Sequence, residues 1–380
     1  MAKRRRSGGR DVSLVTEPWM KHLYLAFDDW SWGYSIRKVD LTDSGDSWHT
    51  GGRPLFSTDE EEGAGGIPRV PPVVIRLEAP HGSPKYFASA FGARILAMHP
   101  RIQSDWQHMM PESFFPIYDV GRRGLFWGPR PTANPVDPIY IAAHGMFFAL
   151  DTGPCLEGLF WPPMEQLGGH NVVWTWFKLQ DPPFERQEVI SYGAHPDGQI
   201  LFSTVTNNGG TAATYALNTK YPFSWSLLGN WRLPFAGCGH FDVRRRAFVG
   251  LSGDPDTLGH LYSCSAIGSD VKLSKKRLFS VNGDSTEVHL GATLLYLGRK
   301  FCLVHCIGLD DDDDGSNNND GIEERAAPRR IHLYRLTTLS VKYGRNNGAL
   351  KTGRSRRVQY CRVPESASEP VLKNPVAFWL

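Results

Sequence analysis

The sequence has few cysteines, no N-glycosylation acceptor and no long apolar run. Six cysteines in 380 residues are too few for the disulfide framework of a small secreted domain. No Asn-x-Ser/Thr triplet occurs, and no run of about 18 or more apolar residues is present to cross a membrane. These absences predict a protein with reduced thiols that is neither secreted nor membrane-bound and that resides in the cytoplasm, the nucleus or both.

Short signatures of catalysis are also missing. The sequence contains no Gly-x-Ser-x-Gly elbow, no P-loop, no His-Glu-x-x-His motif and no dinucleotide-binding Gly-x-Gly-x-x-Gly turn. A catalytic centre assembled from distant loops would leave no such trace. The motifs therefore predict no catalytic residue, no cofactor and no metal ligand, and they favour a protein that is not an enzyme.

An acidic run resembles the first half of a calcium-binding loop. Asp310, Asp312 and Asp314 occupy the first, third and fifth ligand positions, and Gly315 the sixth. The twelfth position, which needs a bidentate glutamate, is Gly321. We therefore interpret the run as part of an acidic loop insertion, residues 310–328, between two strands.

The segment CLVHC raises the question of zinc, because further candidate ligands stand at Cys238 and His240. On a strand, Cys302 and Cys306 share one face while His305 points to the other, since successive side chains alternate. One site using all three is awkward to build. We interpret the cysteines as buried structural thiols.

Charge is balanced along most of the chain. The net charge is +3, and the first ten residues, MAKRRRSGGR, carry five basic side chains and no acid. The remainder is close to neutral, which argues against a wholesale nucleic-acid-binding surface. We expect residues 1–20 to form a disordered basic tail, in which KRRR is either a nuclear-import signal or an ordinary solvated terminus.

The sequence is rich in short alternating apolar runs separated by turn residues, of which there are 39 Gly and 27 Pro. Runs such as HLYLAFDD (22–29) and IYIAAHGMFFALD (139–151) have the period of two that strands require. A Pro-Phe pair at 183–184 recurs 51 residues later at 234–235, each time before a new strand. Four-stranded groups repeating at roughly 40 to 50 residues are typical of a β-propeller.

We therefore predict an all-β, kelch-like β-propeller of about six four-stranded antiparallel blades, with a large β-sandwich as the alternative. One propeller domain is expected over residues 21–365, followed by a C-terminal tail at 366–380. Residues 41–84 and 153–169 read as long and irregular. The protein is expected to be a monomer.

The stretch ISYGAHPDGQILFS places a histidine, an aspartate and two glycines between apolar runs. Pro196, Asp197 and Gly198 have the geometry that tight turns need, because proline presets φ, aspartate bonds nearby backbone and glycine tolerates positive φ. A general base would need a positioned partner, and none is visible beside His195. We interpret the segment as a hairpin corner.

Several motifs resemble a known family: YLAFDDWSWGYSIRKVDL, VVIRLEA, MFFALD, ISYGAHPDGQILFS, GNWRLPFAGCGHFD, AFVGLSG and GHLYSCS. Together they are similar to the plant, grass-expanded domain of unknown function 1668 family over roughly residues 20 to 365. The resemblance implies a kelch-like or propeller-like fold and no particular activity. This chain carries a basic corner where relatives tend to be acidic or neutral.

Our functional prediction is a non-enzymatic scaffold that binds an unidentified protein partner. The candidate interaction residues are the basic corner and two aromatic residues: Arg244, Arg245, Arg246, Trp127 and Trp161. The alternatives are a propeller enzyme acting on a small or carbohydrate-like ligand, or a nucleic-acid-associated protein whose basic clusters at 244–246, 275–277 and 354–357 converge on one rim. Clustered carboxylates in a pocket would favour the enzyme, whereas an aromatic and Arg-rich rim would favour the binder.

Overall fold

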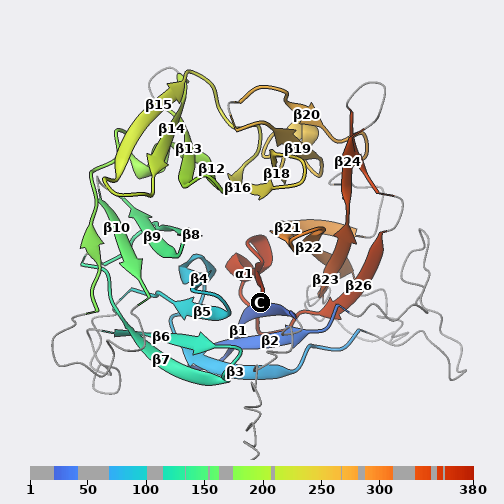
Figure 1. Ribbon diagram of the computed structural model, residues 1–380. Coiled ribbons are helices and arrows are strands. Elements are labelled where there is room, and N and C mark those ends of the chain that lie inside the picture. Colours follow the sequence, from blue (N-terminus) through green and yellow to red (C-terminus); the bar gives the residue numbers. More distant parts are fainter. Residues whose placement is uncertain are drawn as a thin grey trace, which may run out of the picture.

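The computed structural model describes residues 21–41, 68–100, 114–132, 134–152, 155–161, 174–206, 210–266, 268–280, 287–310, 330–343, 349–353 and 356–380. Its strands form six sheets of four antiparallel strands, arranged in a ring like the blades of a propeller (Figure 1). In the described part of the chain, α-helix is confined to α1 (Glu369–Lys373). The structure thus confirms an all-β propeller of six blades rather than a sandwich.

The first three blades use the N-terminal half of the chain together with one strand from its C-terminal end. From the innermost strand outward, blade 1 contains β27 (Val376–Trp379), β1 (Leu23–Trp30), β2 (Gly33–Val39) and β3 (Val73–Glu78). Blade 2 contains β4 (Phe87–Ala90), β5 (Arg94–Ala97), β6 (Phe114–Asp119) and β7 (Gly124–Pro129). Blade 3 contains β8 (Ile139–Ala143), β9 (Met146–Asp151), β10 (Cys155–Phe160) and β11 (Phe177–Lys178).

Blades 4 to 6 continue the order. Blade 4 contains β12 (Val189–His195), β13 (Gln199–Val205), β14 (Ala212–Asn218) and β15 (Ser224–Gly229), with the short β16 (Gly237–Cys238) parallel to β12. Blade 5 contains β17 (His240–Asp242), β18 (Ala247–Leu251), β19 (Leu261–Cys264) and β20 (Lys272–Leu273). Blade 6 contains β21 (Glu287–Tyr296), β22 (Phe301–Asp310), β23 (Arg330–Leu339) and β26 (Arg357–Arg362). The hairpin of β24 (Val341–Tyr343) and β25 (Leu350–Thr352) lies between β23 and β26 in sequence, and three short 3-10 turns are η1 (Pro84–Tyr86), η3 (Arg186–Glu188) and η4 (Pro255–Thr257).

The core lies between neighbouring blades. Apolar residues at alternate strand positions face the adjacent sheet, so neighbouring blades bury clusters between them, and one cluster spans blades 6, 1 and 2. The recurring Pro-Phe pairs take part, because Phe184 and Phe235 are both buried just ahead of an inner strand. The sequence repeat therefore marks an aromatic side chain that packs at the start of blades 4 and 5.

The C-terminal segment closes the ring. β27 pairs with β1 antiparallel, from Val376 opposite Ala26 to Trp379 opposite Leu23. Residues 366–380, which the sequence led us to expect as a tail, thus supply α1 and the inner strand of blade 1. α1 passes so close to β21 that a Cβ on Gly291 would lie 2.1 Å from the Lys373 carbonyl oxygen, so this position requires glycine.

The structure also bears on the segments that the sequence marks as irregular, as a basic tail and as an acidic insertion. Residues 153–169, which read as irregular, contain β10, a central strand of blade 3. The expected basic tail at 1–20 and nearly all of the acidic insertion at 310–328 lie outside the described residues. Within the described residues, no helix has the length and apolar character needed to cross a membrane.

Candidate interaction site

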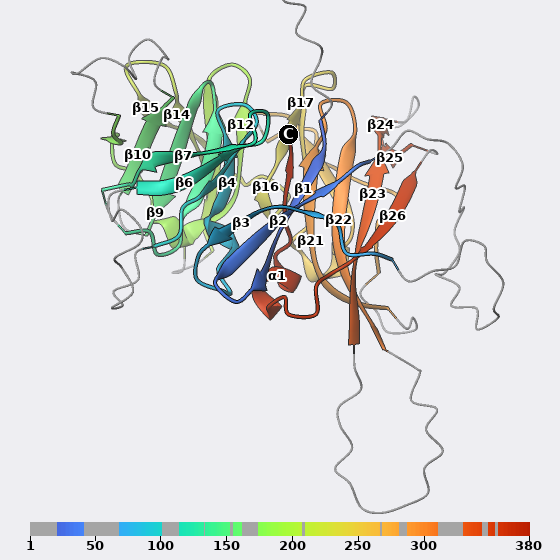
Figure 2. The ribbon, with the colours of Figure 1, turned by 90° about the horizontal axis from the view of Figure 1, so that it is seen from below.

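One face of the ring gathers the hairpin turns that join the first and second strands of blades 2 to 6, at residues 91–93, 144–145, 196–198, 243–246 and 297–300. We call it the turn face. In blade 1 the same face holds the end of β27 and the start of β1, where the His22 and Leu380 backbones exchange hydrogen bonds of 2.7 and 3.1 Å. The opposite face, which we call the α1 face, holds α1 (Figure 2).

A cavity of about 750 Å³ lies on the turn face at the seam where blade 6 meets blade 1. It is lined by residues from both ends of the chain and from blade 6: Lys21, Leu41, Tyr296, Leu297, Gly298, Arg299, Lys300, Leu336, Thr338, Arg357, Gln359 and Trp379. We call it the seam groove. No linear motif announces it, because strand pairing alone brings its residues together.

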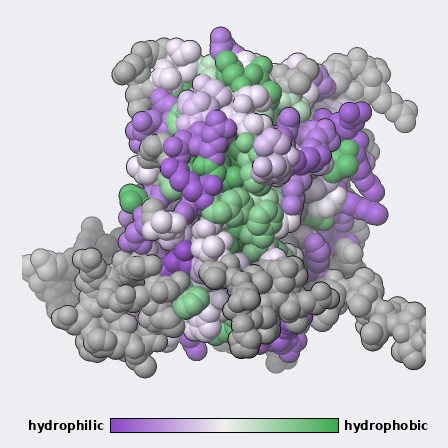
Figure 3. Space-filling view, turned by 60° about the vertical axis from the view of Figure 1, so that its left-hand side comes forward, coloured by the Kyte–Doolittle hydropathy of each residue, from purple (hydrophilic) through white to green (hydrophobic). Residues whose placement is uncertain are grey.

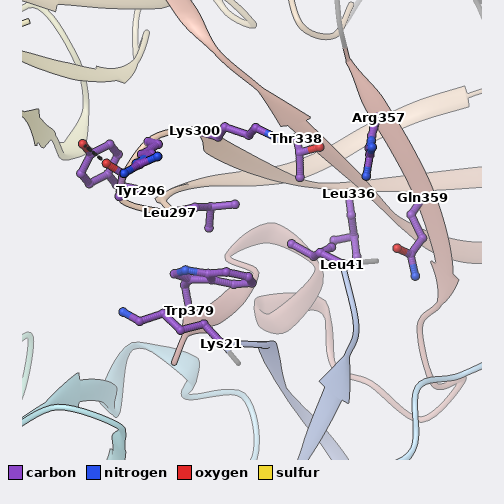
Figure 4. Close-up of a pocket in the computed structure, with 12 residues that line it drawn as sticks. Lys21, Leu41, Tyr296, Leu297, Lys300, Leu336, Thr338, Arg357, Gln359 and Trp379 are labelled. Atoms are coloured by element: carbon purple, nitrogen blue, oxygen red, sulfur yellow. Dashed lines mark hydrogen bonds between the residues drawn. The ribbon is translucent and has the colours of Figure 1, made fainter. Parts of the chain in front are cut away.

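The floor of the seam groove is apolar. Leu336 on β23 is 1% exposed, and the partly buried Leu41, Leu297 and Trp379 pack against the same core cluster. Figure 4 shows these four side chains directed into the space between β23 and the end of β27. Such a floor offers a place for aliphatic or aromatic groups.

The rim of the groove is cationic. Four exposed basic residues line it, from the segment just before β1, the β21–β22 turn and β26: Lys21, Arg299, Lys300 and Arg357. No carboxylate side chain is among the described residues that line the groove. The next residue to Leu41, Asp40, contacts His22 and Lys38 at 2.5 and 3.3 Å. An anionic group entering the groove would therefore meet positive charge on several sides.

The basic corner expected from the sequence lies on the turn face of blade 5. Arg244 and Arg246 are exposed in the turn between β17 and β18, while Arg245 pairs with the buried Asp242. Burial raises the pKa of Tyr296, Asp242 raises it further, and Arg244 and Arg245 lower it. On the turn face the turn at 243–246 is the neighbour of the turn at 297–300, whose residues line the seam groove.

A family model described as "Protein of unknown function (DUF1668)" matches residues 20–360. The chain belongs to the DUF1668 family. A solved structure of a protein from Lactobacillus plantarum is similar at 11% identity over 91% of this chain and 98% of that one, with a TM-score of 0.38. At that TM-score the likeness supports no inference about function. The comparison with curated proteins found no match.

In this DUF1668 protein the two candidate tryptophans lie away from the basic corner. Trp127 is 43% exposed on β7 of blade 2. Trp161 follows β10 of blade 3, where the Arg94 guanidinium carbon lies 3.9 Å from its ring centroid and Trp174 packs at 5.1 Å. Figure 1 places β7 and β10 across the ring from β18 and β19. The five residues therefore do not form one surface, and the seam groove replaces the tryptophans as neighbour of the corner.

The three basic clusters also divide between faces. Residues 244–246 and Arg357 lie on the turn face. Lys275 and Lys276 follow β20, which runs away from the turn face because it is the fourth antiparallel strand of its blade. The clusters at 244–246 and 275–277 thus do not share a rim, while residues 354–355 lie outside the described part of the chain.

Pro196, Asp197 and Gly198 form the turn between β12 and β13, with Gly198 at φ +97°. His195 stacks edge-on against Phe241 of blade 5, with ring centroids 4.4 Å apart, and burial lowers its pKa. Its Nδ1 atom lies 3.4 Å from an Asp197 carboxylate oxygen. The histidine has a packing role between blades 4 and 5.

The CLVHC segment divides its side chains as alternation requires. Cys302 and Cys306 are buried in the core cluster of blades 6 and 1. His305 lies on the other face, where its ring stacks on Phe279 at 4.4 Å and contacts His289 at 2.8 Å. In the part of the chain that the structure describes, no group of three or more His, Cys, Asp or Glu side chains is arranged to hold a metal ion.

An apolar stripe runs along the outer wall on the side of β10 and β15 (Figure 3). Phe160 at the end of β10 is 51% exposed and stacks on Phe177, and Leu227 on β15 is 56% exposed. β15, whose sequence is SWSLLG, carries no charged side chain beside its apolar ones. In this it differs from the seam groove, where basic residues stand beside an apolar floor. It offers no chemistry that selects a partner.

Proposed function

We propose that this protein is a non-enzymatic interaction scaffold that binds a protein partner through the turn face. The observation that carries the proposal is the seam groove, which combines an apolar floor with a cationic rim on the face that also carries the exposed Arg244. Rigid scaffolds commonly carry their binding residues on loops, and Arg and aromatic side chains are enriched at interfaces.

The chemistry of the groove supports binding over catalysis. Hydrolysis of a sugar bond needs a pair of carboxyl groups flanking the bond. The described lining of the groove supplies lysine, arginine, leucine, tyrosine and tryptophan instead. We therefore favour the scaffold over an enzyme acting on a carbohydrate-like ligand.

The proposal also assigns the protein to the interior of the cell, in the cytoplasm, the nucleus or both. All six cysteines are free, and Cys264, Cys302, Cys306 and Cys361 are buried. Burial raises the pKa of the Cys302 thiol to about 12, which keeps it protonated and unreactive. Thiols of this kind are in keeping with a reducing compartment.

Affinity purification with quantitative mass spectrometry tests the scaffold function. The double variant Arg244→Glu/Arg246→Glu reverses charge on the turn face, and Lys275→Glu/Lys276→Glu makes the same change on the α1 face. We expect the first variant to lose the partners that the wild-type protein recovers and the second to keep them. Equal recovery by both folded variants would contradict binding through the turn face.

A further inference from the structure

We propose that the seam groove binds an acidic linear segment of a partner protein and that a leucine or aromatic side chain of this segment inserts into the groove floor. The inference rests on the proposed scaffold function and names the chemistry of its partner. It follows from three features: the apolar floor, the cationic rim, and the continuation of positive charge beyond the groove.

The floor selects an apolar anchor. Leu336, Leu41 and Trp379 form its base, and the volume of about 750 Å³ lies in the range of pockets that enclose whole ligands. Burying one leucine or phenylalanine side chain there would contribute about 1.5–3 kcal/mol of hydrophobic free energy. A purely polar acidic chain would leave this contribution unused.

The rim selects negative charge around that anchor. Lys21, Arg299 and Lys300 are exposed and line the groove from two segments that are far apart in the sequence. Asp40, the residue before Leu41, already contacts the basic side chains of His22 and Lys38. A carboxylate-bearing segment would therefore meet attraction on entry, with no Asp or Glu among the lining residues that the structure describes.

The spread of charge indicates an extended occupant. The hairpin turn of blade 5 carries the exposed Arg244 and Arg246. On the turn face it lies next to the hairpin turn of blade 6, which carries Lys300. Exposed basic side chains thus stand on the turn face of three successive blades, blades 5, 6 and 1. An extended peptide advances about 3.3 Å per residue and can follow such a path.

A nucleic acid fits the same charge less well. Single strands bind by stacking bases on aromatic rings along a basic groove. Here the floor is mainly aliphatic, with Leu41, Leu297 and Leu336, and its aromatic residues are Tyr296 and Trp379. Leucine side chains complement aliphatic groups better than base planes, so we assign the groove to a peptide.

Fluorescence anisotropy with the full-length protein tests the assignment. The probe is a fluorescein-labelled peptide of about ten residues, the length that spans about 33 Å when extended, built from glutamate with interspersed leucine and one tryptophan. We expect Arg299→Glu/Lys300→Glu to weaken its binding about tenfold or more, because charge reversal at an interface replaces attraction by repulsion. Lys275→Glu/Lys276→Glu on the α1 face should leave the affinity within about twofold, since exposed charges far from a site are largely screened.

Two further arms separate peptide recognition from general attraction of anions. A peptide with alanine in place of its leucine and tryptophan should bind at least about tenfold more weakly, and Leu297→Gln should weaken the parent peptide in the same direction. Equal affinity for both peptides would overturn the inserted anchor. A single-stranded oligonucleotide of equal charge that binds as tightly, with the same loss in Arg299→Glu/Lys300→Glu, would assign the groove to nucleic acid instead.

The outcomes also separate this inference from the scaffold function itself. If neither peptide binds but Arg244→Glu/Arg246→Glu loses its partners in the affinity purification, the turn face binds proteins by another chemistry and the acidic-segment inference fails alone. If the purification also shows no difference, the scaffold function fails with it.

Discussion

Gly198 shows how one residue fixes the corner between β12 and β13. Its φ of +97° lies in a region that side chains other than glycine rarely adopt, and an added Cβ would lie 2.8 Å from Cε of Lys220. We expect Gly198→Val to lower the free energy of unfolding by about 1–3 kcal/mol through backbone strain. Urea denaturation measures the change.

Two glycines provide controls for that substitution. Gly145 has φ +78° and nothing near its Cβ position, so Gly145→Val isolates the cost of the backbone conformation. Gly121 has no such φ, and Gly121→Val should cost clearly less. Equal stability of the Gly198 and Gly121 variants would contradict strain at the corner.

His305 carries the clearest pH dependence. Arg335 donates to its Nδ1 atom at 2.9 Å, which leaves Nε2–H to donate to Nδ1 of His289 at 2.8 Å, and Arg335 also pairs with Glu287 at 2.8 Å. Burial lowers the pKa of His305 to about 2, and Arg335 and His289 act in the same direction. The imidazole is therefore neutral in the folded protein.

Because the unfolded chain binds a proton on this imidazole below its ordinary pKa of about 6.5, stability falls as the pH drops below that value. The slope from His305 alone approaches about 1.4 kcal/mol per pH unit. His305→Gln keeps an acceptor for Arg335 and cannot titrate, so its stability should fall less steeply between about pH 6.5 and 4.5. Parallel urea-denaturation profiles for the two proteins would contradict this account.

At the scale of elements, β27 is the strand on which ring closure depends. It pairs with β1 over four positions, and Phe378 on it is only 8% exposed. We expect Phe378→Ala to lower the free energy of unfolding by about 3–5 kcal/mol, the usual cost of removing a buried phenylalanine ring. Thermal and chemical denaturation check the value.

Phe160→Ala is the matched control, because Phe160 is 51% exposed on the outer wall. Its substitution should cost about 1 kcal/mol or less. If the two variants were equally stable, β27 would not be needed to hold the ring closed.

Strands are easier to predict from the sequence when the two strands of a hairpin follow one another directly than when a strand pairs with a distant segment. FFPIYDVGRRGLFWGP shows both strands and their turn, and these are β6 and β7. β27 has only four residues, VAFW, and its partner β1 lies at the other end of the chain, so no local turn announces it. β10 is different, because it pairs with β9 directly before it in sequence. Its sequence CLEGLF has a glutamate and a glycine at buried positions, which breaks the apolar alternation that marks a strand.

At the scale of the whole molecule, the repeated strand groups were enough to predict six blades, because each blade is one local unit. The candidate site was predicted only in part. Arg244, Arg245 and Arg246 are contiguous and visible, whereas Lys21, Arg299 and Trp379 meet only once the ring has closed. Because the groove is built from both ends of the chain and from blade 6, its residues show no motif or regular spacing in the sequence.

The basic run at residues 3–6 precedes the blades, and its predicted effect is on where the whole protein resides in the cell. If residues 3–6 (KRRR) act as an import signal, a fluorescent fusion of the full-length protein should lose nuclear signal when all four become alanine, because import receptors recognise clustered positive charge. Unchanged distribution of the alanine variant would show that the run has no such role.

Hydrogen–deuterium exchange, read by mass spectrometry on the complex with a partner recovered by affinity purification, tests most directly whether the turn face binds proteins. Amides that become buried on binding exchange more slowly, so the partner should protect the turns at 243–246 and 297–300. Residues 275–277 on the α1 face and β15 on the outer wall should exchange as in the free protein. If the partner protected only residues 275–277 or β15 and left the turns at 243–246 and 297–300 unchanged, the account would be contradicted.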